Sequence, residues 1–142
     1  GWHMFDQPWQ FEREDWTPSP GARRFEAGSP NTMGQTAFNA SSRLLLDYGM
    51  ANVGRRVLAN TDHLIRRLQD LPGTRLCSPA SPERRSGIVR FSHERFSNLD
   101  LHRLLTGAGI SCVIRGDAIR LSPHFYQGES QLESFMNVLE GL

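Results

Sequence analysis

The stretch "ISCVIRGDAIRLS", residues 110–122, decides the fold of this chain. Two short apolar runs flank the pair Gly116–Asp117, and a two-residue turn rich in Gly and Asp is typical of a hairpin between antiparallel strands. The order Gly-Asp is a weaker hairpin signal than Asp-Gly, but the runs on both sides favour extended structure. We therefore predict strands over 110–115 and 118–122, joined by a tight turn.

Arg120 lies between two apolar residues of the second predicted strand, directly before "LSPHFY". A buried guanidinium needs hydrogen-bond partners, because an unpaired buried charge costs free energy. Its planar fork matches a carboxylate in bidentate geometry, and Arg115, across the turn, can point to the same side. The residues alone leave two interpretations open. Either these arginines bind an anion, or they form structural ion pairs or face water.

Further elements surround the hairpin. Residues 74–78 and 87–91 are short strand candidates, and Asn98 can cap a helix over 99–106. Residues 129–142 space their apolar side chains as an amphipathic helix does; these are Leu132, Phe135, Met136 and Leu139. The order after residue 73 is therefore strand, strand, helix, strand, strand, helix.

Two helices precede this part of the chain. Thr32 is a plausible N-cap for a helix over 33–48, which Gly49 ends. A second helix carries apolar residues at intervals of three, four or seven; these are Met50, Val53, Val57, Leu64, Leu68 and Leu71. The predicted fold class is α+β: a small antiparallel sheet of three to four strands with helices packed on it, preceded by two helices and an irregular N-terminal arm.

Residues 1–31 form the predicted arm. They hold three tryptophans without a period of 2 or 3.6, and aromatic residues without a regular element indicate a segment that packs against something else. The loop 28–31, "GSPN", is a further candidate site. We predict a boundary between this arm and a domain over 32–142.

The composition excludes several classes of function. The net charge of +1 offers no basic field for nucleic acid. The longest apolar run is Leu44–Leu46, too short to span a membrane. The five histidines form no metal-binding pair, so we expect no metal site. Cys77 and Cys112 form no CxxC motif, and we expect two reduced thiols in a cytoplasmic protein.

All 16 basic residues are arginine, so the chain contains no lysine. This absence has a direct chemical consequence, because a Schiff base needs a side-chain amine. No side chain of this chain offers the ε-amine that forms such a bond with an aldehyde cofactor.

Three segments of the sequence resemble a known family. "RRFEAGSPNTMGQTAFNASSRLLLDYG", "GIVRF" and "LLTGAGISCVIRGDAIRLSPHFYQGESQLESF" are similar to the C-terminal part of class V pyridoxal-phosphate (PLP) enzymes, which include cysteine desulfurases, kynureninases, isopenicillin-N epimerase-like proteins and class V aminotransferases. The resemblance covers essentially all 142 residues. It implies that residues 1–31 belong to the end of a large PLP domain absent from this chain, and that 32–142 form the small domain.

The resemblance also implies roles for four residues. Arg120 matches the arginine that binds the α-carboxylate of the substrate, and Arg115 matches a basic position near the substrate. Ser29 matches a polar residue that contacts the PLP phosphate of the partner subunit in a homodimer. Trp2 matches a kynureninase-like tryptophan at the same shared edge, although an aromatic anchor would explain it equally well.

The implied function is that of a domain within a PLP-dependent enzyme acting on an amino acid, while this chain alone is expected to be inactive. Cysteine desulfurases carry their nucleophilic cysteine in a loop before the substrate-binding arginine. No cysteine lies between Arg115 and Arg120, and this absence argues against that subfamily. Transamination, elimination and racemisation all stay open. The alternative is a non-catalytic, free-standing small domain that serves as a protein-binding or dimerisation module.

Overall fold

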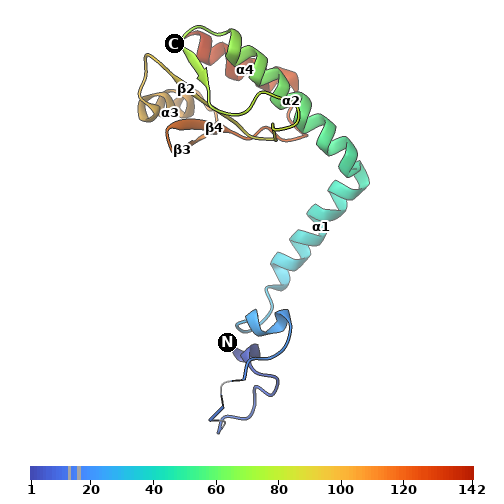
Figure 1. Cartoon of the computed structure of the whole chain (residues 1–142). Helices are drawn as coiled ribbons and strands as arrows, with labels where there is room; N and C mark the ends of the chain where they lie inside the picture. Colours follow the sequence, from blue (N-terminus) through green and yellow to red (C-terminus); the bar gives the residue numbers. More distant parts are fainter. Residues whose placement is uncertain (13, 16) are drawn as a thin grey trace. The chain divides into compact units, whose positions relative to one another are not determined.

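The computed structural model describes residues 1–12, 14–15 and 17–142. Trp16, one of the three tryptophans of the predicted arm, lies outside the described residues. The chain divides into two compact units, Gly1–Leu44 and Leu45–Leu142. Figure 1 shows both units, coloured along the sequence from blue to red. The predicted boundary at residue 31 concerns the domains of a longer parent protein and stays a prediction.

The N-terminal unit begins with two short 3-10 helices, η1 (Trp2–Met4) and η2 (Ala22–Phe25). Hydrogen bonds tie this segment together: the Trp2 N–H donates to the Ala27 carbonyl at 3.1 Å. The Ser19 hydroxyl donates to Asp6 Oδ1 at 2.6 Å, and Ser19 is buried. The predicted arm is therefore irregular but folded on itself.

Two long helices follow, α1 (Thr32–Tyr48) and α2 (Met50–Asp70). Gly49 separates them with a φ of 90°, a left-handed conformation that glycine adopts without strain. Of the predicted apolar face of α2, Val53, Leu64 and Leu68 are buried, whereas Met50 is exposed. The hydrophobic period thus located the helix correctly, although its first residue, Met50, does not reach the core.

Both predicted N-caps are wrong by one residue. Thr32 is the first residue of α1, and the side chain of Asn31 accepts the backbone N–H three residues later at 2.9 Å. Likewise Ser97, and not Asn98, caps helix α3 (Asn98–Gly107), where its hydroxyl accepts an N–H at 3.1 Å. In each case two adjacent residues had suitable side chains, and the first of the two makes the bond.

The sheet has four antiparallel strands in the order β1 (Thr74–Leu76), β2 (Val89–His93), β4 (Ala118–Leu121) and β3 (Val113–Arg115). The predicted hairpin is confirmed, with Ile114 opposite Ile119. Strand β2 runs two residues beyond the predicted end, because β1 pairs with its far end.

The turn between β3 and β4 depends on Gly116, whose φ is 62°. Among the described residues only glycines have positive φ, so Asp117 does not share this conformation. Glycine at the first turn position is typical of a type II′ turn. The two-residue turn predicted from the sequence is therefore present and has a specific conformational cause.

Cys112 lies outside strand β3, which corrects the predicted strand over 110–115. The His102 ring contacts the Cys112 carbonyl at 3.2 Å, so this carbonyl is bonded to helix α3 rather than to a neighbouring strand. The strand therefore begins only at Val113.

The helices α2, α3 and α4 (Glu129–Glu140) pack on one face of the sheet, and Figure 1 shows α2 and α4 side by side above the strands. Phe91 and Phe135 meet edge to face, with ring centroids 5.9 Å apart. The fully buried core side chains come from all three helices and the two central strands; they include Leu68, Val89, Phe91, Leu101, Leu105, Ile119 and Met136.

The opposite face of the sheet has no helix of the unit 45–142 on it. Because side chains alternate along a strand, the residues between the core positions point to this side. We call it the open face, and define it by Arg75, Arg90, Ser92, Val113, Arg115, Ala118 and Arg120.

Among the described residues, no helix combines the length and the apolar character that a membrane span requires.

Candidate functional site

Arg120 lies at the centre of the open face. It pairs in register with Arg90 of β2 on one side and Val113 of β3 on the other. The residue is half-buried, and its Nε is buried without a hydrogen-bond partner. Within the described part of the chain, the Arg120 side chain has neither an ion pair nor a hydrogen bond. A buried donor without a partner costs free energy, and a ligand that accepts its hydrogen bond removes this cost.

Arg90, directly opposite, is engaged. Its Nη2 donates to Asp117 Oδ1 at 2.7 Å and to the Arg115 carbonyl at 3.1 Å. Asp117 Oδ2 also lies 3.9 Å from Nη2 of Arg75. The carboxylate of the turn is therefore shared by two arginines, and Arg120 is not one of them.

Arg115, the second predicted site residue, lies on β3 opposite Ala118 and is exposed. Its side chain has no ion pair or hydrogen bond among the described residues. The structure thus brings Arg115 and Arg120 to the same face of the sheet, on neighbouring strands, both with free head groups.

The loop that follows β4 is fixed by a buried residue of α2. Asn60 is 3% exposed and donates to the carbonyls of His124 at 2.9 Å and Gln127 at 3.2 Å. The His124 ring stacks on Tyr126, with centroids 4.8 Å apart, and its Nδ1 is buried without a partner. The sequence reasoning missed Asn60, although a polar residue four positions before Leu64 on the apolar face of α2 is a signal for it.

The other two predicted residues lie in the N-terminal unit. Trp2 packs on Trp9, with ring centroids 5.1 Å apart, and half of its surface is exposed. A side chain added at Gly28 would lie 3.8 Å from Trp2 Cδ1, so the loop with the exposed Ser29 runs beside this indole. The structure therefore places the loop that carries Ser29 beside Trp2 in the N-terminal unit, and Arg115 with Arg120 on the open face.

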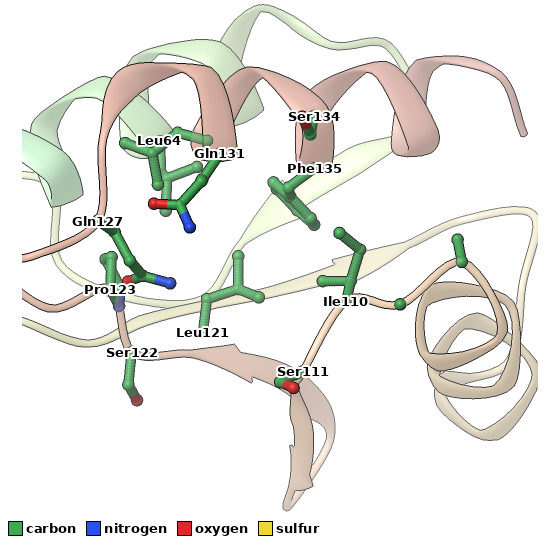
Figure 2. Close-up of a pocket in the computed structure, with 13 residues that line it drawn as sticks. Leu64, Ile110, Ser111, Leu121, Ser122, Pro123, Gln127, Gln131, Ser134 and Phe135 are labelled. Carbon is green, nitrogen blue, oxygen red and sulfur yellow. The ribbon is translucent and has the colours of Figure 1, made fainter.

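A hollow of about 420 Å³, lined in part by α4 and by the residues after β4, contains none of the four predicted site residues. Figure 2 shows an apolar floor with the amide nitrogens of Gln127 and Gln131 turned toward the space. Both amides are fixed, because Gln127 Oε1 accepts the His124 N–H at 2.7 Å and Gln131 Oε1 accepts the Gly128 N–H at 2.9 Å. The hollow offers neutral donors and no charged side chain.

Cys112 is a poor nucleophile in this fold. Burial raises the pKa of its thiol above the ordinary value, so less of the reactive thiolate is present near neutral pH. No group of three or more His, Cys, Asp or Glu side chains that could hold a metal occurs among the described residues.

These observations define a class of protein: an α+β domain whose sheet is covered by helices on one face and presents unpartnered arginines on the other. The family model of class V aminotransferases matches residues 1–131. The chain belongs to this family.

Three curated relatives show the range of the family. The chain is 26% identical to a probable cysteine desulfurase of Pyrococcus abyssi, over 84% of this chain and 33% of the relative. It is 27% identical to isopenicillin N epimerase of Streptomyces clavuligerus, over 92% and 34%. It is 28% identical to kynureninase of Deinococcus radiodurans, over 66% and 23%. The chain thus spans between 23% and 34% of the length of these relatives.

Solved structures share the fold. The apo cysteine desulfurase of Thermococcus onnurineus NA1 superposes with a TM-score of 0.77 at 23% identity, over 89% of this chain and 34% of that chain. A NifS-like protein gives a TM-score of 0.70 at 20% identity. At these identities the likeness shows the fold alone.

Class V enzymes depend on PLP, and the residues of this chain fit only part of that requirement. Arginine and serine side chains can bind carboxylate and phosphate groups. The covalent bond to PLP needs an amine, and the chain has no lysine. No lysine of this chain can therefore hold the cofactor covalently.

Proposed function

We propose that this chain is the C-terminal domain of a PLP-dependent class V enzyme that acts on an amino acid. The observation that carries the proposal is the state of Arg120: it is half-buried, and its side chain has no ion pair or hydrogen bond among the described residues. The Nε atoms of Arg85 and Arg90 are likewise buried without a partner, but the head groups of both are paired with carboxylates. A guanidinium in the state of Arg120 gains charge-assisted hydrogen bonds from a carboxylate. In this proposal Arg120 binds the α-carboxylate of the substrate.

The remaining parts of the proposed enzyme come from outside this chain. The large N-terminal domain supplies the lysine and the bound PLP, which acts as an electron sink when present. Ser29 contacts the phosphate of the cofactor in a homodimer, and Trp2 lies at the same edge. The exposure of Ser29 beside Trp2 supports both assignments. The proposed compartment is the cytoplasm, where free thiols such as those of Cys77 and Cys112 stay reduced.

The turn between the two arginines bears on the type of reaction. Only four residues separate Arg115 from Arg120, and the tight turn at Gly116 leaves no room for a longer loop with a cysteine nucleophile. Cys112 lies before the strand, with a raised pKa of its thiol. Both observations argue against a cysteine desulfurase and are compatible with transamination, elimination or racemisation.

A second candidate function is a free-standing module that binds a protein or a second copy of itself. The exposed aromatic residues of the N-terminal unit favour it, among them Trp9 and Phe11, each more than 70% exposed. The reading frame upstream of Gly1 separates the two candidates. A continuous frame encoding a lysine-bearing domain supports the enzyme, and a start codon at this point supports the module.

A binding experiment tests the role of Arg120. The chain is titrated with a stable cofactor–substrate adduct, N-(5′-phosphopyridoxyl)-L-alanine, by calorimetry. Arg120→Gln is expected to weaken binding about tenfold to a hundredfold, the range for a charge-assisted hydrogen-bond pair. The matched control Arg103→Gln removes an exposed arginine of α3 and leaves the affinity unchanged. Equal affinities of Arg120→Gln and the unaltered chain would refute the role.

A further inference from the structure

The open face carries far more positive than negative charge. Every strand contributes an arginine to it, and the turn between β3 and β4 contributes one carboxylate, that of Asp117. The four arginines are Arg75, Arg90, Arg115 and Arg120. Like charges on neighbouring strands destabilise a sheet, so the excess positive charge calls for an anionic partner.

The single carboxylate is already committed. Asp117 lies 2.7 Å from the guanidinium of Arg90 and 3.9 Å from that of Arg75. Arg115 and Arg120 have no carboxylate within ion-pair distance among the described residues. The one negative charge of Asp117 is therefore shared by Arg90 and Arg75, and Arg115 and Arg120 are left for a ligand.

The register sets the spacing of the two free arginines. Arg115 is opposite Ala118, and Arg120 is opposite Val113, so they are diagonal neighbours on adjacent strands. Diagonal neighbours on one face of a sheet lie about 7–8 Å apart. The side chain between them on β4 is the small Ala118, which leaves the space between the two head groups free of bulk.

We propose that Arg115 binds a second acidic group of the substrate, and that the enzyme therefore acts on an amino acid with an acidic side chain. This inference rests on the proposed function, in which Arg120 binds the α-carboxylate. Each guanidinium can bind one carboxylate through two parallel hydrogen bonds. A dicarboxylic ligand satisfies both arginines, whereas a monocarboxylic ligand leaves Arg115 unpaired.

The test compares ligands of equal length on the full chain. The ¹⁵N-labelled chain is titrated by NMR with glutarate, which has two carboxylates, and with pentanoate, which has one. Glutarate is expected to bind about tenfold more tightly, since the second carboxylate adds a charge-assisted interaction. Arg115→Gln removes this preference, Arg120→Gln weakens both ligands, and the control Arg103→Gln changes neither affinity. The NMR spectrum of each variant reports whether it is folded.

The possible failures are distinguishable. If glutarate and pentanoate bind equally while Arg120→Gln weakens both, the inference on Arg115 is overturned and the role of Arg120 stands. If Arg115→Gln weakens pentanoate binding as much as glutarate binding, both arginines bind the same carboxylate. The proposal that the substrate has an acidic side chain is then overturned. If Arg120→Gln changes neither affinity, or if neither ligand binds, the proposed function fails together with the inference.

Discussion

Arg90 and Arg120 lie directly opposite each other on β2 and β4, and only Arg90 has a carboxylate partner. Two cations in this position repel each other unless a negative charge intervenes. Asp117 supplies that charge to Arg90 through the tight turn and leaves Arg120 free. The sheet thus holds one arginine in a structural ion pair and keeps its neighbour available, which is the arrangement an anion-binding site requires.

Asp117 should limit the repulsion on the open face. Asp117→Asn leaves the arginines there without a counter-charge, and we expect the free energy of unfolding to fall by up to about 1 kcal/mol at low salt. The loss should shrink in about 1 M salt, because ions screen the interactions between exposed charges beyond about 3 Å. Urea unfolding at both salt concentrations measures this. The control Asp70→Asn, at the exposed end of α2, should show no such loss, and an equal loss at both salt concentrations would contradict the electrostatic cause.

The turn between β3 and β4 should require glycine at position 116, because the backbone there has a positive φ. Its φ of 62° is unfavourable for other residues, so Gly116→Ala should lower the free energy of unfolding by about 1–2 kcal/mol. Gly107→Ala is the matched control, because this glycine ends α3 with open space around it and no positive φ. Thermal unfolding compares the two variants. Equal stability of both would mean that the turn tolerates a side chain.

Asn60 should hold the loop after β4. Asn60→Ala removes the donor to the His124 and Gln127 carbonyls in a buried place, so we expect a loss of about 1–3 kcal/mol in the free energy of unfolding. Amide hydrogen exchange should become faster over 122–128. Asn137→Ala, on the exposed face of α4, is the control and should be neutral. Unchanged exchange in the loop of Asn60→Ala would show that other contacts hold it.

Cys112 should titrate at a higher pH in the folded chain than in the unfolded one, since burial raises its pKa. A raised pKa favours the neutral thiol, so this contribution to stability is complete below the unfolded pKa of about 8.5 and is lost as the pH rises through the folded pKa. The alkylation rate of the Cys77→Ser variant, which keeps a single thiol, measures the effect against pH. The pH midpoint of the alkylation rate should fall when urea unfolds the chain. A common midpoint in both states would refute the burial effect.

Much of the fold follows from local patterns in the sequence. The hairpin was predictable because two apolar runs flank a Gly-Asp pair, and α2 because its apolar residues repeat at helical spacing. The N-caps were missed by one residue, since Asn31 and Thr32 both carry side chains that can cap, and only tertiary geometry decides between them. The start of β3 was missed because the His102 contact to the Cys112 carbonyl joins residues of different elements.

The candidate site was predictable only in part. Arg120 was singled out as a candidate because a charged residue between apolar residues of a strand needs hydrogen-bond partners. Its free state could not be predicted, because it depends on Asp117 pairing with Arg90, which is 27 residues away in the chain. Pairings of this kind follow from the register of the sheet, and a single sequence does not record that register.

The most direct measurement is the NMR signal of the Arg120 Nε–H group in the ¹⁵N-labelled chain, assigned by its disappearance in Arg120→Gln. If this guanidinium binds the carboxylate of an amino acid, the signal should shift and saturate on titration with the phosphopyridoxyl-alanine adduct, with the dissociation constant found by calorimetry. The Nε–H signal of Arg90, whose Nη2 is paired with Asp117, should shift much less. An Arg120 signal that stays in place while the adduct binds would contradict the account.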